Sequence, residues 1–88
     1  PLSPAYPQEM RHVMATYTLE LTEIELACGV TLEQVADVLP RVLVRDGRLF
    51  LPANTPPALG KAVARCVFAD EPHTFIGITL GMPAYKLT

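Results

Sequence analysis

Few side chains in this 88-residue sequence could perform acid–base, nucleophilic or metal chemistry. Its two histidines, His12 and His73, lack a cysteine or carboxylate at a spacing typical of a catalytic or metal site. Asp70 and Glu71 precede His73, but the stretch DEPH is typical of a solvated loop. No glycine pattern is followed by the helix that a phosphate-binding loop needs. We therefore predict no enzymatic activity, no metal and no cofactor.

The two cysteines, Cys28 and Cys66, are too few for a zinc site or a disulfide framework. Both lie among apolar residues on predicted helices, where a thiol usually packs as a small hydrophobic group. A Cys28–Cys66 bridge remains an alternative. Reduced thiols are typical of a reducing compartment, so we expect an intracellular protein, cytoplasmic or nuclear. The sequence has no apolar run long enough to span a membrane.

Charged residues, which could bind a partner, separate into an acidic and a basic segment, although the net charge is only −2. Residues 15–40 contain no lysine or arginine, and their acidic residues are Glu20, Glu23, Glu25, Glu33 and Asp37. Residues 41–65 contain one acidic residue, Asp46, and the basic residues Arg41, Arg45, Arg48, Lys61 and Arg65. This dipolar pattern suits a protein interface, where complementary charges set orientation and partner choice.

A β-hairpin is predicted at the centre of the basic segment. Asp46-Gly47 separates two alternating apolar runs, 42–45 and 48–51. An Asp-Gly pair in this position is typical of a tight hairpin, because the turn requires positive φ angles. Three arginines lie in or beside the hairpin: Arg41, Arg45 and Arg48.

Two short helices are predicted before the hairpin. Each begins with a threonine followed three residues later by Glu or Gln, which is the spacing of a capping box: Thr22 with Glu25, and Thr31 with Gln34. Gly29 is placed to end the first helix, over 23–28, and Pro40 to end the second. The side chains expected to point inward from the second helix are Leu32, Val35, Ala36, Val38 and Leu39.

Further elements are predicted on both sides of this centre. Before it, we expect an extended lead-in over 1–7, a helix over 8–15 and a short strand over 16–21. After it, Thr55 is expected to cap a helix over 57–69 that buries Leu59, Val63, Cys66 and Val67. The apolar run 74–80 predicts a strand with a bulge at Gly77, and 81–88 is expected to be a loop. That strand either joins the core sheet or pairs with another chain.

The order of these elements resembles the winged-helix superfamily. The stretches that carry the resemblance are LTEIELACGVTLEQVADVLP and RVLVRDGRLFLP. Gly29 matches the turn of a helix-turn-helix, and the apolar positions are matched by Ile24, Cys28, Val30, Val35 and Val38. Glu25 departs from the small residue usual in the superfamily.

This resemblance implies an α+β, winged-helix-like fold, helix–strand–helix–helix–hairpin, with an extra C-terminal helix and strand. We expect one domain over 8–88, with its core over 8–52 and an extension over 53–88.

Winged helices most often bind DNA, and a minority bind proteins. Carboxylates on the second helix would repel phosphates, so we favour a protein–protein interaction or domain-positioning module cut from a larger protein. The residues expected to contact the protein partner, or other domains of the parent chain, are Arg41, Arg45, Arg48, Glu33 and Asp37. The alternative is a nucleic-acid-binding winged helix, with the three arginines on phosphates and Gln34 reading a base. In a third interpretation, the arginines only keep a sheet edge soluble.

Overall fold

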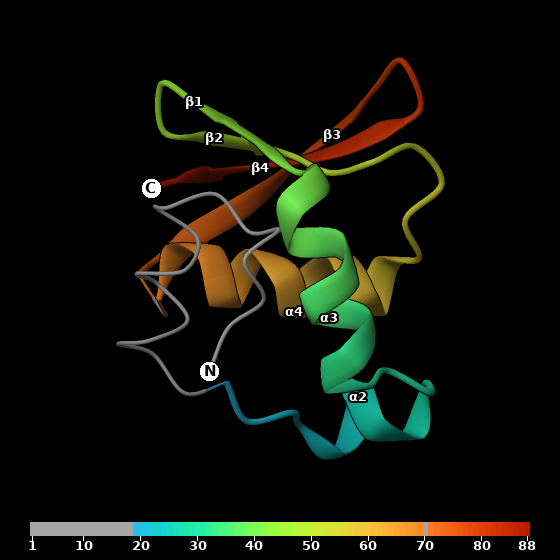
Figure 1. The fold of residues 1–88 in the computed structure, drawn as a ribbon. Coiled ribbons are helices and arrows are strands. Elements are labelled where there is room, and N and C mark those ends of the chain that lie inside the picture. Colours follow the sequence, from blue (N-terminus) through green and yellow to red (C-terminus); the bar gives the residue numbers. More distant parts are fainter. Residues whose placement is uncertain (1–18, 70) are drawn as a thin grey trace.

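The computed structural model of the chain describes residues 19–69 and 71–88 (Figure 1). The predicted lead-in 1–7, the helix 8–15 and His12 lie outside these residues. The described elements are α2 (Glu23–Ala27), α3 (Leu32–Val38), the 3-10 helix η1 (Leu39–Arg41), β1 (Leu43–Arg45), β2 (Arg48–Phe50), α4 (Pro57–Phe68), β3 (His73–Thr79) and β4 (Met82–Leu87). The predicted α+β class is confirmed.

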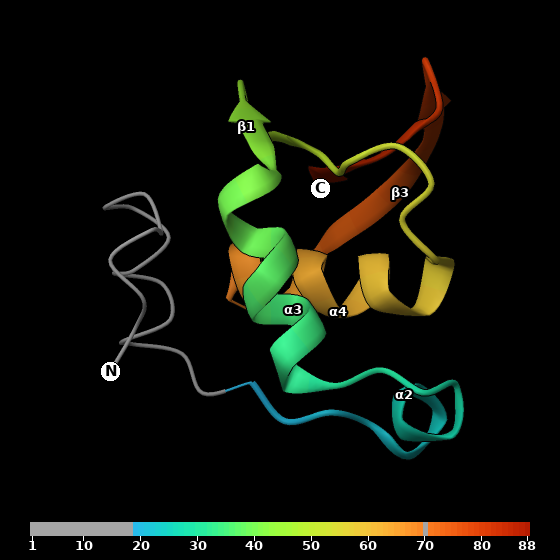
Figure 2. The same cartoon turned by 45° about the vertical axis from the view of Figure 1, so that its right-hand side comes forward.

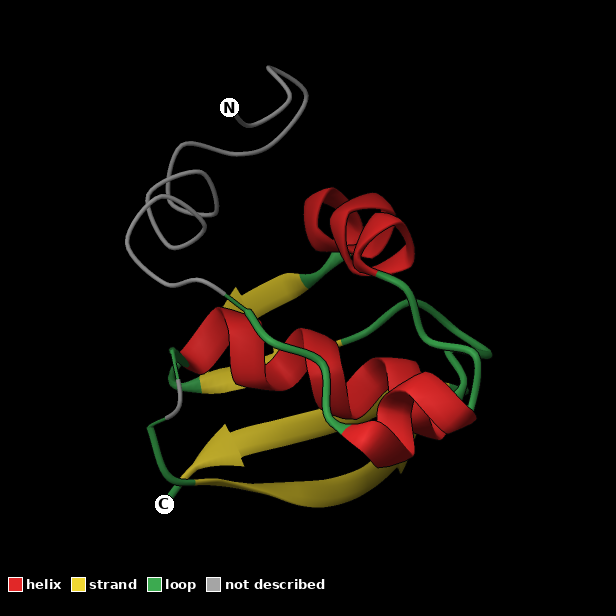
Figure 3. Ribbon diagram, turned by 90° about the horizontal axis from the view of Figure 1, so that it is seen from below, coloured by secondary structure: helices red, strands yellow, loops and turns green. Residues whose placement is uncertain are grey.

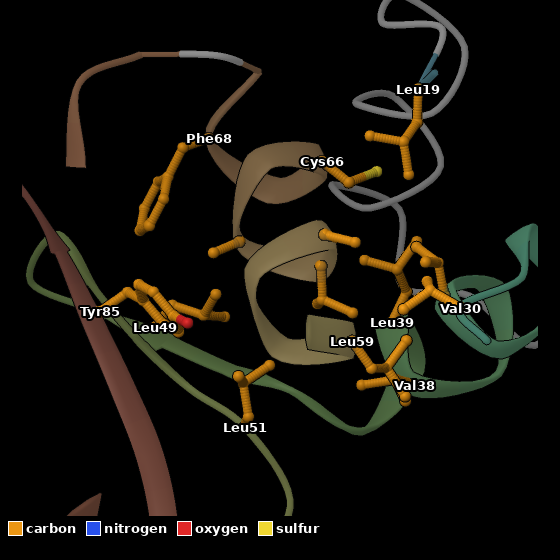
Figure 4. Close-up of a cluster of buried hydrophobic side chains, with 14 residues drawn as sticks. Leu19, Val30, Val38, Leu39, Leu49, Leu51, Leu59, Cys66, Phe68 and Tyr85 are labelled. Atoms are coloured by element: carbon orange, nitrogen blue, oxygen red, sulfur yellow. The ribbon is translucent and has the colours of Figure 1, made fainter. Parts of the chain in front are cut away.

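The four strands form one antiparallel sheet in the order β1-β2-β4-β3. The three α-helices lie on one side of this sheet, with α4 nearest to it and α3 packed against α4 (Figures 1 and 2). Buried side chains fill the space between α4, the sheet and α3 (Figure 4). The fully buried ones include Val35, Leu39, Leu49, Leu51, Val63 and Cys66. The predicted extension 53–88 therefore supplies a large part of the core.

The predicted hairpin at Asp46-Gly47 is confirmed. Both residues have positive φ, 53° and 73°, and Arg45 pairs with Arg48 across the two-residue turn. This is the combination that a type I′ turn requires, and its twist matches that of the flanking strands.

A second hairpin of the same kind joins β3 to β4, so the prediction that 81–88 is a loop was wrong. Leu80 and Gly81 have φ angles of 51° and 80°, and Thr79 pairs with Met82. Pro83 lies within β4, a central strand, where proline is unusual because it has no N–H. In the structure, the Leu51 N–H donates to the Pro83 carbonyl at 2.9 Å, and Pro83 has no N–H to return the bond. The β2–β4 ladder ends there, so the proline is tolerated.

The predicted strand 16–21 lies partly outside the described residues, and its described part, 19–21, is not a strand. A short strand is stable only when it pairs, and residues 19–21 pair with none of the four strands. Leu19 is buried in the core all the same. At Leu19, the apolar position of the pattern therefore corresponds to burial and not to β-structure.

Both predicted capping boxes are present. The Glu25 and Gln34 N–H groups each donate to the threonine hydroxyl three residues earlier, at 3.1 Å in both cases. The predicted cap of α4 is wrong: the Thr55 hydroxyl donates instead to the Pro52 carbonyl at 2.6 Å. Pro56 occupies the N-cap position of α4 without a side-chain bond.

The predicted inward side of α2 was wrong in part. Ile24 is 76% exposed and Cys28 is exposed, whereas Glu25 is buried. Leu32, at the start of α3, is also exposed, although Val35, Val38 and Leu39 are buried as predicted. A five-residue helix can bury only one narrow side, and in α2 that side carries the charged residue.

Neither cysteine forms the alternative Cys28–Cys66 disulfide. Cys66 is buried on α4 as predicted, but Cys28 is exposed beyond the last turn of α2. Within residues 19–69 and 71–88, no helix has both the length and the apolar character needed to cross a bilayer.

Candidate functional site

A row of three basic residues runs across three neighbouring strands. Arg45 of β1 lies directly opposite Arg48 of β2, and Arg48 lies opposite Lys86 of β4. Because neighbouring strands are about 4.8 Å apart, the Cα atoms of the three residues follow one line across the sheet. We call Arg45, Arg48 and Lys86 the basic row.

The basic row lies on the side of the sheet that the helices leave uncovered. Leu49 and Tyr85 are buried and point toward α4 (Figure 4). Successive side chains of a strand alternate between the two faces, so Arg48 and Lys86 point the other way. Their exposure agrees with this assignment, since all three side chains of the row are exposed.

Apolar residues form a second row beside the basic one on the same face. Leu43 pairs with Phe50, and Phe50 pairs with Ala84. Leu43 is 57% exposed, Phe50 is half-buried and Ala84 is buried. We call the two rows together the open face. It combines charge with accessible apolar area, which is the composition of a docking surface.

Like charges directly opposite one another destabilise a sheet, so the basic row calls for a compensating anion. The nearest acidic group is Asp46, whose Oδ2 lies 4.0 Å from Arg45 Nε with both side chains largely exposed. Arg48 and Lys86 form no ion pair with any residue of 19–69 and 71–88. The row therefore retains most of its positive potential.

The structure brings only two of the predicted site residues, Arg45 and Arg48, into the basic row. Arg41 lies on η1, and its Nη2 is 3.9 Å from Asp37 Oδ2 of α3, an exposed pair of low energy. Glu33 is exposed on α3, which lies on the helical side of the sheet. Gln34 Oε1 accepts the Thr31 N–H at 2.9 Å, so its side chain serves the capping box.

Lys86 was missed because residues 81–88 were predicted to be a loop. The signal that could have found it is the Gly81 turn, followed by a second run of strand residues. Pairing that run with β3 would have made β4 a strand and placed Lys86 beside the arginines.

Glu25 and Arg65 form a largely buried ion pair, so the two charges compensate each other and neither is free to pair with a partner. Arg65 Nη2 lies 2.6 Å from Glu25 Oε1 and donates to the Glu20 carbonyl at 3.2 Å. Glu25 Oε1 also accepts the Thr22 N–H at 2.8 Å. The pair fixes α2 against α4, which explains why Glu25 can stand where a small residue was expected.

Two of the residues considered for chemistry, Cys66 and His73, pack against other side chains. Burial raises the pKa of the Cys66 thiol to about 11, which makes it a poor nucleophile. The His73 ring stands 5.2 Å from the Phe68 ring and 6.1 Å from the Tyr85 ring, between centroids, and its Nδ1 is 2.7 Å from the Glu71 carbonyl. His73 begins β3 and is not in a loop as predicted.

The open face is the strongest candidate for a site in the described part of the chain. It offers fixed cations and apolar area on a rigid sheet, without groups arranged for catalysis. No group of three or more His, Cys, Asp or Glu residues that could hold a metal is found within 19–69 and 71–88. Comparison of the chain with protein-family models, curated proteins and solved structures finds no match.

Proposed function

We propose that this chain is a winged-helix-like protein-docking module whose open face binds an acidic segment of a protein partner or of a neighbouring domain of the same parent protein. The winged-helix assignment is supported by the order α2, turn at Gly29, α3 and hairpin β1–β2. The observation that carries the function is the basic row, three cations aligned across the sheet without a matching row of carboxylates.

The basic row matches the chemistry of carboxylates. Arginine binds a carboxylate through two parallel N–H groups, and two arginines of the row stand side by side. Leu43 and Phe50 add apolar area that an acidic segment with interspersed hydrophobic residues would cover. The proposed partner segment is therefore acidic and partly apolar.

Nucleic acid is the second candidate, favoured by the same row because phosphates also bind arginine. The acidic residues Glu33 and Asp37 remain exposed on α3, and in a winged helix they would face the duplex. The chain as a whole has a net charge of −2. Both facts weaken phosphate binding, so we place protein docking first.

A direct comparison of two probes separates these functions. The 88-residue chain is titrated, by fluorescence anisotropy, against a labelled peptide in which glutamate alternates with leucine and phenylalanine, and against a 20-base-pair duplex. The test variant is Arg48→Glu, at the centre of the row. The matched control is Arg41→Glu, an exposed arginine outside the row.

We expect the peptide to bind, Arg48→Glu to weaken binding by roughly tenfold or more, and Arg41→Glu to have a small effect. Duplex binding that falls steeply with salt, together with no peptide binding, would assign the module to nucleic acid. If neither probe binds at low salt, the docking function of the open face is wrong.

A further inference from the structure

A groove of about 730 Å³ lies on the other side of the sheet, between α4 and the outer strand β3. Figure 3 shows β3 as the outer strand of the sheet, next to β4. Lys61 and Arg65 of α4 form one wall, and the opposite wall and floor carry Phe75, Ile78, Pro83 and Tyr85. This volume is within the range of sites that bind ligands.

The strand that borders the groove is an unprotected edge. β3 is an end strand of the sheet, and within 19–69 and 71–88 no strand pairs with its outer side. Its sequence HTFIGIT has no acidic residue, lysine, arginine or proline, the usual means by which an edge avoids pairing. Three large apolar residues of β3 are each more than two-fifths exposed: Phe75, Ile76 and Ile78. Such an edge is a template for an added strand.

We propose that an extended peptide of another protein adds to the outer edge of β3 as a fifth strand. Its alternate apolar side chains enter the groove against Phe75 and Ile78, and one acidic side chain contacts Lys61. The bulge between Phe75 and Gly77 disturbs the edge, so we expect regular pairing along His73–Phe75.

Charge complementarity decides what kind of peptide occupies the groove. Lys61 is exposed and forms no ion pair with the described residues, whereas the guanidinium of Arg65 is held by Glu25. Glu71 also lines the groove, so the partner carboxylate is expected beside Lys61 and away from Glu71. A second copy pairing through its own β3 would bring no carboxylate from that strand, which favours a different protein.

This site is independent of the open face, because it lies on the α4 side of the sheet and shares none of the open face's side chains. Its occupant is recognised by main-chain hydrogen bonds and alternate side chains. The open face, by contrast, recognises side-chain charge. The two proposals can therefore succeed or fail separately.

Three synthetic peptides test the proposal on the 88-residue chain. The first is an N-acetylated decapeptide in which valine alternates with threonine, with glutamate at two of the valine positions, on the side that faces the groove. The second has lysine in place of both glutamates, and the third has proline at its centre, which removes an N–H. Affinity is measured by fluorescence anisotropy, and hydrogen exchange locates the β3 amides that become protected.

We expect the glutamate peptide to bind and to protect amides within His73–Phe75, and the proline peptide to bind at least roughly tenfold more weakly. Ile78→Asp should weaken binding roughly tenfold without unfolding the chain, since Ile78 is 67% exposed. Lys61→Glu should weaken the glutamate peptide and strengthen the lysine peptide, each by roughly fivefold. The control Arg48→Glu should leave all three affinities unchanged.

Several outcomes would overturn the proposal. Binding that Arg48→Glu abolishes, without protection of β3, would place the peptide on the open face. A dimer in light scattering that Ile78→Asp dissolves would assign the edge to a second copy. Equal affinity for the proline and glutamate peptides would exclude strand addition, as would no binding of either.

Discussion

Replacing Glu25 by alanine removes the buried contact that holds α2 to α4. The carboxylate accepts two hydrogen bonds, from the Thr22 N–H and from Arg65, and its side chain is only 8% exposed. Loss of the reciprocal cap bond costs about 1 kcal/mol. Removing one partner of a fully buried ion pair costs about 3–5 kcal/mol. We take about 2 kcal/mol here because the Arg65 side chain is 24% exposed. The expected loss in the free energy of unfolding is thus about 3 kcal/mol.

Urea unfolding followed by far-ultraviolet circular dichroism measures this loss without a tryptophan, which the sequence lacks. For a domain of this size, about 3 kcal/mol also lowers Tm by more than about 10 °C. The matched control is Glu23→Ala, which removes an exposed carboxylate from the same turn of α2 and should cost at most about 0.5 kcal/mol. Glu25→Gln keeps the acceptor and the shape but loses the charge, so we expect an intermediate loss.

The double variant Glu25→Leu with Arg65→Met separates charge compensation from simple packing. Removing both partners leaves no uncompensated charge, so the double variant should be more stable than Glu25→Ala. If Glu25→Ala is as stable as Glu23→Ala, the ion pair contributes nothing to stability and does not hold α2 against α4.

Three further changes test the turns and the cysteines. Gly47→Val should destabilise the chain by about 1 kcal/mol or more, because a β-branched residue resists the φ of 73°, and unchanged thermal stability would mean another turn type. Leu80→Asn should raise the free energy of unfolding by about 0.5–1 kcal/mol, since Leu80 is 88% exposed and Asn tolerates its φ of 51°; a loss in urea unfolding would contradict this. Iodoacetamide should modify Cys28 rapidly and Cys66 only on unfolding, which mass spectrometry distinguishes, and equal rates would disprove the burial of Cys66. The pKa of the Cys66 thiol rises from 9.0 to about 11 on folding. The stability that the buried neutral thiol contributes is therefore complete below pH 9, and it is lost as the pH rises from 9 to 11. The free energy of unfolding of a Cys66→Ala chain should decline less steeply over that pH range.

Local signals in the sequence predicted the local structure well. The two capping boxes and the Asp46-Gly47 turn depend on residues three positions apart or fewer, and each is present. The helix 57–69 was predicted to within one residue at its end because its apolar spacing is continuous over three turns. These features need no knowledge of distant contacts.

Predictions that depend on distant contacts were less successful. Glu25 gave no sign of burial, because its partner Arg65 lies forty positions along the chain. Two of the three residues of the basic row, Arg45 and Arg48, were predicted, but Lys86 joins them only through the pairing of β2 with β4. β4 was not predicted, and it contains Pro83, a residue that is rare in central strands and is tolerated here where the β2–β4 ladder ends.

The position of β4 in the sheet also has a consequence for folding. The two hairpins close through two-residue turns and can each form alone within microseconds, but only β4 joins them, by pairing Arg48 with Lys86. Until that joining step, the main-chain groups on the edge of β2 that faces β4 are unpaired. We therefore expect assembly of the sheet to be the slow, non-local event, and a chain that has not completed it to be the species most prone to aggregate.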